Sequence, residues 1–379
     1  MDGTMPSRFE FGAEASGEAR PCDSASPVDD DRDRRGSSEI LTGNALDQEL
    51  DRTLRIAQPA HPARDLRWLR ILEAGFRHRP YLVQFRQGEN VQGRLPLAFV
   101  KSALFGRMLV SLPYVNSGGV QAETPEIAKQ LIDAAVALAD QLNCRYLELR
   151  HEQRYSHPAL TMEMDSKVHL RLTLPTTAGT LWDKLKSSVR NQVRKGQRQG
   201  FTVRWGGEEL LRDFYQVFSH TMRNLGTPVF GQSLFRSILT HLSDRAEFCG
   251  IYDGRRCVAS GLLLHGTETT EVPSAAALHR YRPTNANMLL YWHLLERAVQ
   301  RGQHCFDFGR STVDSPTYRF KKQWGAQPSP ACWQYYLRSG SVDALRPENE
   351  SNQRLIKIWK RLPVRLTRWL GPPIVRGIP

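Results

Sequence analysis

HCFDFGRSTVDSPTYRFKKQWG, residues 304–325, is the stretch that says most about the fold and chemistry of this chain. It begins as an apolar strand, 305–308, in which the carboxylate of Asp307 stands between two phenylalanines. We expect that strand to end at Gly309, in a polar loop that contains Arg310. Beyond the loop, cations alternate with aromatic rings, at Tyr318, Arg319, Phe320, Lys321, Lys322 and Trp324. Cations bind phosphate and rings offer flat contact, so the stretch suits a large anionic substrate; a solvated basic turn beside a core strand is the alternative, and composition favours neither.

This stretch closes the second of two passes through one order of elements, helix–strand–strand–strand–loop–helix–strand. Hydrophobic periodicity predicts the first pass at 65–76, 81–86, 92–100, 108–112, 113–119, 125–142 and 145–149. It predicts the second at 208–224 with 233–243, then 246–252, 257–265, 269–277, a Pro/Asn loop, 286–301 and 305–308. The pattern indicates an α/β (α+β) fold of two tandem domains, each a mixed sheet flanked by helices.

Composition predicts where the domains begin and end. Residues 1–55 are rich in Gly, Ser, Asp and Arg without apolar periodicity, and we expect a disordered leader there. The first domain is expected over 56–178 and the second over 179–340, opening with a basic connector helix at 181–200. A basic amphipathic tail, 341–379, completes the chain.

Charge favours phosphate-bearing partners. The net charge is +13, yet residues 1–50 hold 12 acidic and 5 basic side chains, so the rest of the chain carries about +20. Nucleic acid, nucleotide-sugars, polyprenyl phosphates and anionic lipid headgroups all fit such a surface. The alternative is that the charge only maintains solubility.

Two segments concentrate the positive charge. Residues 184–204 contain seven cations and no acid, and four of them recur at helical spacing as a basic ridge: Lys186, Arg190, Arg194 and Arg198. A polyanion such as tRNA would offset their mutual repulsion; a solvated helix with incidental charge is the alternative. Residues 354–379 also contain seven cations and no acid, interleaved with Trp and Leu. We expect the part at 354–370 either to lie on an anionic membrane surface or to dock on the domain.

Several kinds of chemistry have no motif in this sequence. There is no phosphate loop of the common NTPase type, no dinucleotide fingerprint, no HExxH and no nucleophile elbow, and the histidines lack metal-ligand spacing. We therefore expect no metal site and no tightly bound cofactor, and catalysis by positioning. The loop 113–119 offers Asn116, Gly118 and Gly119 as substrate contacts, because adjacent glycines let a ligand approach the backbone.

The cysteines and the apolar runs indicate a cytoplasmic protein. The six cysteines form no CxxC pair, which predicts reduced thiols. No apolar run reaches the roughly 20 residues of a membrane-spanning helix, and the N-terminus lacks the pattern of a secretory signal.

Three segments, SSVRNQVRKGQRQGFTVRWG (187–206), TMRNLGTPVFG (221–231) and FDFGRSTVDSPTYRFKKQWGAQP (306–328), closely resemble FemAB-like proteins. The resemblance is strongest to the branch associated with the exosortase/PEP-CTERM system of exopolysaccharide-producing bacteria. It implies two GNAT acyltransferase domains in tandem, in agreement with the doubled pattern. Characterised relatives transfer an aminoacyl group from aminoacyl-tRNA to an amine of a peptidoglycan precursor, and a Phe-Lys pair faces donor and acceptor; here that pair is Phe320-Lys321.

The chain also departs from these relatives. Asn116-Ser117-Gly118-Gly119 replaces their Pro…Gly-Pro loop, and the long helical arm with which some of them contact tRNA is missing. The acetyl-CoA loop pattern of simple GNAT enzymes is not visible either. Both aminoacyl-tRNA and acyl-CoA therefore remain as candidate donors.

The resulting hypothesis is a cytoplasmic N-acyltransferase, peripheral at the inner face of the membrane, acting on an amine of a cell-wall or exopolysaccharide precursor. Lys321 would stabilise the developing oxyanion or a donor phosphate. Asp307 would orient or deprotonate the amine, or serve as a structural carboxylate. Phosphate contacts are assigned to Arg310, Arg319 and Lys322, and the shape of the pocket to Tyr318, Phe320 and Trp324. A non-catalytic protein that holds a lipid-linked or polyanionic glycan, and an RNA-binding protein, are the alternatives.

Overall fold

A computed structural model describes residues 36–56, 58–103, 105–164, 166–339 and 350–378. Part of the expected disordered leader, residues 1–35, lies outside them. The rest of that expectation is wrong, because β1 (Ser37–Leu41) pairs antiparallel with the next strand and is followed by helix α2 (Gly43–Ile56). Leu46 and Leu50, one turn apart on α2, are buried in the core. Leu46, Leu50 and Leu54 recur at helical spacing on α2, a short pattern that we did not separate from the polar residues around it.

The first sheet carries the first predicted pass. Its strand order is β1-β2-β3-β4-β6-β15-β7, with β5 paired to β3. The strands after β1 are β2 (Arg79–Gln87), β3 (Asn90–Ser102), β4 (Gly106–Val110), β5 (Gln121–Ala122), β6 (Tyr146–His151), β7 (Met162–Met164) and β15 (Cys332–Leu337). The 3-10 turn η1 (Pro62–Arg64) precedes helix α3 (Arg67–Phe76), and α4 (Pro125–Gln141) connects β4 to β6. Thr124 caps α4 by accepting the N–H of Ile127.

The second sheet carries the second pass, in the order β14-β8-β13-β12-β11-β10-β9. Its strands are β8 (Lys167–Thr173), β9 (Thr202–Gly206), β10 (Ala246–Asp253), β11 (Arg256–His265), β12 (Thr269–Ala277), β13 (Cys305–Thr312) and β14 (Gln327–Pro330). Its helices are α5 (Ala178–Lys184), α6 (Ser187–Gln197), α7 (Glu208–Leu225), α8 (Gln232–His241), η2 (His279–Thr284), α9 (Ala286–Gln300) and α10 (Pro316–Gln323). The doubled order and the two-domain α/β architecture are thus confirmed.

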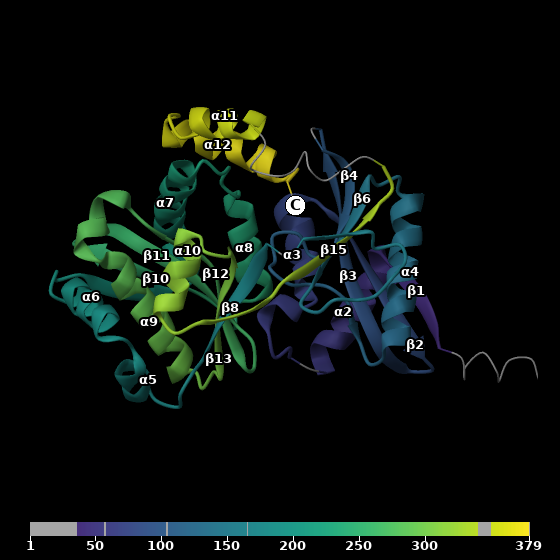
Figure 1. Cartoon of the computed structure of the whole chain (residues 1–379), viewed down its shortest axis with the longest axis horizontal. Coiled ribbons are helices and arrows are strands. Elements are labelled where there is room, and N and C mark those ends of the chain that lie inside the picture. Colours follow the sequence, from purple (N-terminus) through teal and green to yellow (C-terminus); the bar gives the residue numbers. More distant parts are fainter. Residues whose placement is uncertain (1–35, 57, 104, 165, 340–349, 379) are drawn as a thin grey trace, which may run out of the picture.

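The domain boundaries are not those expected, because the two sheets exchange strands. β8 falls within the expected first domain but pairs with β13 and β14 of the second sheet. β15 falls within the expected second domain, yet it crosses back and pairs with β6 and β7 of the first sheet (Figure 1). Each sheet therefore contains one strand, β8 or β15, that was expected in the other domain.

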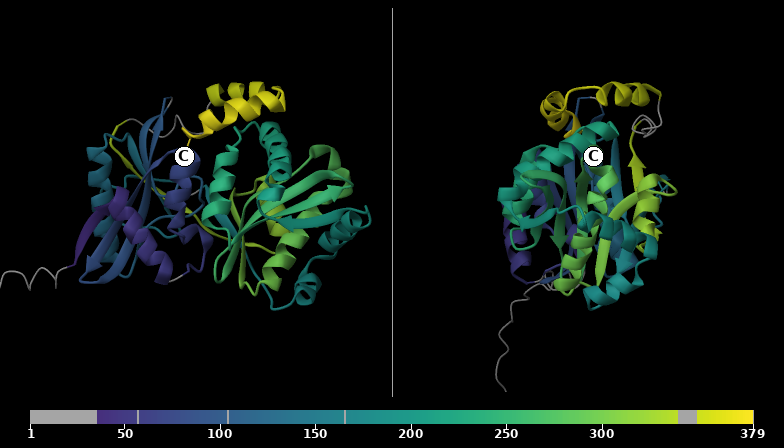
Figure 2. Two further views of the ribbon diagram at one scale, coloured as in Figure 1. Left: turned by 180° about the vertical axis from the view of Figure 1, so that it is seen from behind. Right: turned by 90° about the vertical axis from the view of Figure 1, so that its left-hand side faces the viewer.

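A hydrophobic core shared by both domains fixes their relative position. Helix α3 of the first domain packs on α8 of the second, and the two helices lie side by side in the left view of Figure 2. Gly75 allows this approach, since a Cβ there would lie 3.0 Å from the Cα of Leu234. Leu69 and Phe214, which come from opposite domains, belong to one buried cluster.

The tail forms two helices, α11 (Glu350–Trp359) and α12 (Val364–Val375), which lie over α7 (Figure 1). Gly371 packs against Val229, and the Arg368 Nε donates to the Ser219 Oγ at 2.8 Å. The Tyr114 hydroxyl donates to the carbonyl of Val375 at 3.0 Å. Docking on the domain is thus observed for 354–378, while residues 341–349 lie outside the described ones. Within the described residues, no helix combines the length and the apolarity needed to cross a bilayer.

Candidate active site at the junction of the domains

The second sheet opens where strands β12 and β13 part. They pair in parallel over three residues only, and Glu271 opposite Asp307 is the last pair. β13 does not end at Gly309 as expected. Gly309 adopts a φ of 73°, β13 shifts register against β8, and the strand then continues to Thr312. Phe306 and Phe308 face the core, which leaves Asp307 toward the first domain.

Asp307 is buried, and donors occupy both of its oxygens. Its Oδ1 accepts the N–H of Gly309 at 2.6 Å, and its Oδ2 accepts from the Arg171 Nε at 2.8 Å and the His61 Nε2 at 3.1 Å. The Nδ1 of His61 accepts the N–H of Ala63, so its Nε2 carries the donated proton. Burial acts to raise the pKa of Asp307, but the His61 hydrogen bond and the charges of His61 and Arg171 outweigh it and lower that pKa. This geometry supports the structural role for Asp307 over that of a base.

Arg171 carries the same network into the first domain. Its two terminal nitrogens donate to both carboxylate oxygens of Glu152, at 2.9 and 2.7 Å. Burial opposes ionisation of Glu152, but the Arg171 hydrogen bonds and charge lower its pKa to about 2. Two acids from different sheets are therefore held on one guanidinium.

Glu271 is a functional candidate that sequence reasoning missed. It is 2% exposed, and its Oε1 accepts from the Asn116 Nδ2 at 2.9 Å. Burial raises its pKa, His61 opposes that shift, and the charge of Asp307 reinforces it. A carboxylate with a raised pKa is suited to accept a proton. The only sequence signal was a single acid in the otherwise uncharged segment 269–277.

Lys321 lies beside this carboxylate pair. The Ser315 hydroxyl caps α10 by accepting the N–H of Tyr318, and the helix brings the Lys321 side chain to the end of β13. Its Nζ donates to the carbonyls of Gly309 and Arg310 at 3.1 and 3.0 Å. Burial lowers its pKa to about 8, although Asp307 and Glu271 act in the opposite direction. Its ammonium makes no ion pair with a carboxylate of the described chain and has one N–H left for a substrate.

Arg310 is a second cation at this site that forms no ion pair with a carboxylate of the described residues. Its guanidinium carbon lies 3.4 Å from the ring centroid of Trp333, on the strand that crosses between the domains, and that of Arg150 lies 4.1 Å from the same ring. Burial and the charge of Arg150 lower the pKa of Arg310 to about 9. The buried Trp333 Nε1 and Ser311 Oγ have no hydrogen-bond partner. These donors fit an anion.

The other expected residues of this stretch divide into two groups. Arg319 is exposed and Lys322 is half-buried, on parts of α10 away from Lys321. Phe320 and Tyr318 pack against the second core, and the Phe320 and Tyr291 rings lie 4.8 Å apart. Trp324 is 2% exposed within that core. The expectation that Trp324 lines an open pocket is therefore wrong, because its position on α10 turns the ring inward.

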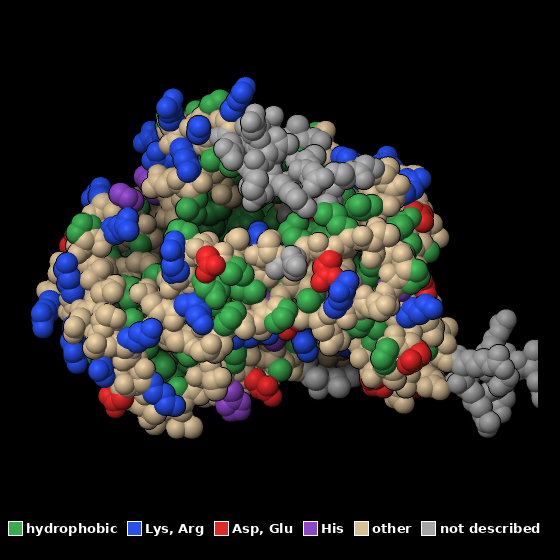
Figure 3. Space-filling view, in the orientation of Figure 1, with side chains coloured by type: hydrophobic (Ala, Val, Ile, Leu, Met, Phe, Trp, Pro, Cys, Tyr) green, Lys and Arg blue, Asp and Glu red, His purple; other side chains and the backbone are tan. Residues whose placement is uncertain are grey.

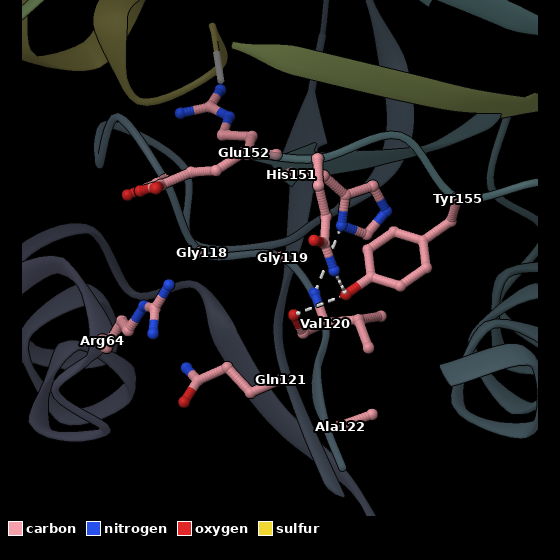
Figure 4. Close-up of a pocket in the computed structure, with 12 residues that line it drawn as sticks. Arg64, Gly118, Gly119, Val120, Gln121, Ala122, His151, Glu152 and Tyr155 are labelled. Atoms are coloured by element: carbon pink, nitrogen blue, oxygen red, sulfur yellow. Dashed lines mark hydrogen bonds between the residues drawn. The ribbon is translucent and has the colours of Figure 1, made fainter. Parts of the chain in front are cut away.

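The loop 113–119 borders a pocket of about 480 Å³ in the first domain, whose walls include Arg64, Gln121, Glu152 and Tyr155 (Figure 4). In Figure 4, Arg64, Gln121 and Glu152 surround one open space, while His151 and Tyr155 lie on its other side. The pocket is polar, and its Arg64 comes from η1.

The loop residues that line this pocket also contact neighbouring protein groups. Gly118 and Gly119 both donate their N–H to the carbonyl of Arg150, and a Cβ on Gly119 would lie 2.3 Å from the His151 Nδ1. Close packing therefore requires these glycines. Their N–H groups bind the Arg150 carbonyl, but both glycines line the pocket, and their contact with a substrate stays a prediction. Asn116 is bound to Glu271 and links this loop to the second domain. The buried Ser117 Oγ, which has no partner, is the loop's candidate contact.

The basic connector is not the single helix expected at 181–200. It forms α5 and α6, which are separated at residues 185–186, and Val189 and Val193 of α6 are buried. Lys186 and Arg198 cap its two ends, Arg194 lies over the Trp182 ring, and Arg190 donates to a backbone carbonyl. None of the four pairs with a carboxylate of the described chain, so the ridge stays open to an anion. A shallow pocket of about 540 Å³ lies next to it, between Lys195 and η2.

No group of three or more His, Cys, Asp and Glu side chains in the described part of the chain is arranged to hold a metal ion. The five cysteines described there are free thiols.

A known protein family matches the part of the chain that holds this site. Residues 183–322 match the acetyltransferase (GNAT) domain family. Both halves of the chain have the GNAT fold. The match itself spans the second GNAT domain, from α5 to α10, and includes the parting strands with Glu271, Asp307 and Lys321.

Solved structures extend the likeness over both GNAT domains. The chain is similar to FemX (TM-score 0.58, 15% identity, 85% of this chain and 100% of that one). It is also similar to a tandem GNAT protein from the clavulanic acid biosynthesis pathway (0.52, 14%, 81% and 100%). A third is the lysylphosphatidylglycerol synthase structure "L-PGS" from Bacillus licheniformis (0.51, 11%, 83% and 97%). At these identities the likeness establishes the fold. A search of curated proteins finds no matching sequence.

Proposed function

We propose that this chain is an acyltransferase whose reaction takes place at the second GNAT domain, where β12 and β13 part. One observation carries the proposal: two half-buried cations, Lys321 and Arg310, form no ion pair with a carboxylate of the described residues, and Lys321 lies beside Glu271, a buried carboxylate with a raised pKa. Cations in this arrangement bind developing negative charge, and the carboxylate takes up a proton. The family match over this region supports the same reaction class.

The reaction follows from these positions. An amine nitrogen attacks the carbonyl carbon of an acyl ester or thioester and passes its proton to Glu271. The carbonyl oxygen becomes an oxyanion, which accepts the remaining N–H of Lys321. The carbon–oxygen or carbon–sulfur bond then breaks, and the leaving group departs with the electron pair. Arg310 binds a phosphate of the donor, and Asp307 holds His61, Arg171 and the Gly309 turn in place.

The donor is proposed to be aminoacyl-tRNA or acyl-CoA, which both present phosphates to the α6 ridge and to the cations near η2. FemAB-like membership, including the exosortase/PEP-CTERM branch, rests on the sequence resemblance and is supported by the likeness to FemX. It favours a cytoplasmic enzyme and an amine of a cell-wall or exopolysaccharide precursor as acceptor. The acceptor's polar part would occupy the first-domain pocket, where the Ser117 Oγ lacks a partner.

Lys321→Met tests the catalytic assignment. It keeps the length of the side chain and removes the ammonium, and we expect kcat to fall roughly 10²–10³-fold with an unchanged circular dichroism spectrum. Lys322→Met, one residue further on the same helix, is the matched variant and should cost at most a few-fold. Transfer of a labelled acyl group to an amine acceptor provides the measurement. An unchanged rate in Lys321→Met would show that the catalytic assignment is wrong.

A second candidate function, RNA binding without catalysis, is favoured by the unpaired α6 ridge alone. It predicts tRNA binding with a steep salt dependence that weakens when Arg194 and Arg198 are both replaced by Gln. Absence of tRNA binding at low salt would remove it. If no donor supports transfer and the protein instead binds a lipid-linked glycan, the non-catalytic binding alternative applies.

A further inference from the structure

The helical tail exposes large apolar side chains at one end of the molecule. Seven large hydrophobic residues of the described chain are exposed, and five of them lie here: Leu225, Leu355, Ile358, Leu366 and Trp369. Trp369 is 74% exposed and Leu355 is 63% exposed. Single exposed hydrophobics are ordinary, but a group of this size marks an interaction surface.

The packing of the tail explains why these side chains face outward. α12 uses Thr367, Gly371 and Val375 against the body, and α11 lies with Ile356 against Gly226 at the end of α7. Leu366 and Trp369, three residues apart on α12, share another part of its surface. Both helices form the outermost layer of this end in each view (Figures 1 and 2). Their inner faces are thus satisfied, and their outer faces have no partner in the described chain.

Positive charge surrounds the apolar group. Five exposed cations accompany it, Arg354, Lys357, Lys360, Arg361 and Arg365, and residues 354–378 contain no acid. Figure 3 shows Lys and Arg side chains projecting from this end around hydrophobic ones, above a hollow in the same face. None of the five pairs with a carboxylate of the described residues.

This combination selects among partners. Protein interfaces are depleted of Lys at their centres, whereas here a cation occurs in nearly every turn. Nucleic acid would use the cations and leave Leu355, Ile358, Leu366 and Trp369 without contacts. An anionic bilayer uses both, because lipid phosphates meet the cations and the apolar side chains enter the headgroup region, where Trp is favoured. The helices have 10 and 12 residues, a length that suits lying in the interface plane.

We propose that α11 and α12 dock the protein on an anionic phospholipid bilayer, with Leu355, Ile358, Leu366 and Trp369 inserted between headgroups and the tail cations on lipid phosphates. The inference does not depend on acyl transfer, since membrane docking is measured without a substrate.

Co-sedimentation of the full chain with vesicles tests the proposal. We expect binding to vesicles of equal parts phosphatidylcholine and phosphatidylglycerol, weakening as salt rises, and little binding to phosphatidylcholine alone. Leu366→Ser with Trp369→Ser should reduce the partition coefficient at least about tenfold. Ile40→Ser, which changes an exposed aliphatic residue on β1 at the other end of the molecule, should leave it unchanged. Absence of binding to the anionic vesicles would overturn the proposal.

A charge series separates docking by the tail from general attraction. Replacing Lys357, Arg361 and Arg365 by Gln should weaken binding roughly fivefold per cation. The matched control replaces Lys186, Arg194 and Arg198 of α6 by Gln, with the same loss of charge, and should have a much smaller effect. If the α6 variant loses binding and the tail variant does not, the docking surface is the ridge and the proposal is wrong.

Fluorescence gives a readout that a folding defect would not mimic. Trp369 is the most exposed tryptophan, so bromine-labelled phospholipids should quench part of the intrinsic fluorescence of the wild-type protein. Trp369→Phe keeps an aromatic ring on the surface and should lose that quenched component while still sedimenting with vesicles. Equal quenching in the wild-type protein and in Trp369→Phe would show that another surface contacts the bilayer.

Discussion

The two GNAT domains each have a parallel strand pair of three residues, and the last positions of those pairs differ in whether the earlier strand carries an acid. In the first domain Val110 lies opposite Glu148; in the second, Glu271 lies opposite Asp307. The acid on the later strand is common to both domains. Only the second domain has an acid on the earlier strand, Glu271. Because Asp307 is already bound by its own donors, Glu271 is the carboxylate that we propose for proton transfer.

One inserted residue makes the second difference. Glu148 and Arg150 stand two apart on β6, and the Arg150 Nε donates to Glu148 at 2.6 Å. In the second domain Gly309 is an extra residue at a register shift of β13. Arg310 therefore lies three residues after Asp307, and its guanidinium stacks on the Trp333 ring. The first domain thus neutralises its own arginine, and the second leaves Arg310 and Lys321 for a substrate.

The largest expected effect comes from the side chain that distinguishes the domains. Glu271→Gln keeps the size of the side chain and removes the proton acceptor, and we expect kcat to fall roughly 10²–10⁴-fold. The labelled-acyl transfer assay measures this, with Asp253→Asn, at the exposed end of β10, as the control. Transfer at the wild-type rate would mean that the two strand pairs do not differ in chemistry.

The acids common to both domains should matter for stability. Glu148→Gln leaves the buried Arg150 without its carboxylate, and we expect it to lower the free energy of unfolding by about 3 kcal/mol. Asp307→Asn removes one of the two carboxylates that bind Arg171, which keeps Glu152, and we expect a loss of about 1–3 kcal/mol. Urea unfolding followed by circular dichroism measures both. Only Asp307→Asn should also reduce transfer strongly, because it releases the Gly309 turn beside Lys321. A folded Glu148→Gln that cannot transfer would place catalysis in the first domain.

The pH profile should report Lys321 and not Arg150 of the first domain. The ammonium is present below its pKa of about 8, so kcat/KM should fall about tenfold per pH unit above that value. At lower pH the rate should rise as Glu271 ionises, through a pKa above its ordinary value. Lys321→Arg should move the alkaline limb upward, since a guanidinium stays charged, while Arg150→Lys should leave it in place. An alkaline limb unaffected by Lys321→Arg would contradict the assignment.

The smallest expected effect concerns the inserted glycine. Gly309→Ala strains a φ of 73° and places a Cβ 2.9 Å from the Asn116 Nδ2, so we expect a loss of about 1–2 kcal/mol in the free energy of unfolding. Gly254→Ala has a similar φ of 56° with no atom within 4 Å and measures the strain alone. Only Gly309→Ala should also slow transfer, by displacing Asn116 from Glu271. Identical behaviour of the two variants would remove the role given to the insertion.

Local patterns made much of the fold predictable. The segment 269–277 was expected as a strand and is β12 at the same bounds, and α4 begins at Pro125 as expected after its Thr124 cap. Alternation and helical spacing are properties of consecutive residues, so they are visible in the sequence. The basic ridge of α6 was visible for the same reason, as was the tail's mixture of cations with Trp and Leu. Lys321 was singled out by the resemblance to FemAB-like proteins, and its role stays a prediction.

The sequence by itself thus determined the order of the elements, the doubling of the fold and the stretch that holds Lys321. Only the tertiary structure decided that β8 and β15 change sheets, because strand pairing depends on partners far apart in the chain. It also decided that Asp307 is saturated by His61 and Arg171, which lie 246 and 136 residues away. Glu271 is recognisable as a candidate only in the structure, where burial and the charge of Asp307 raise its pKa. Burial and long-range charge depend on the packed fold, and no local sequence pattern records them.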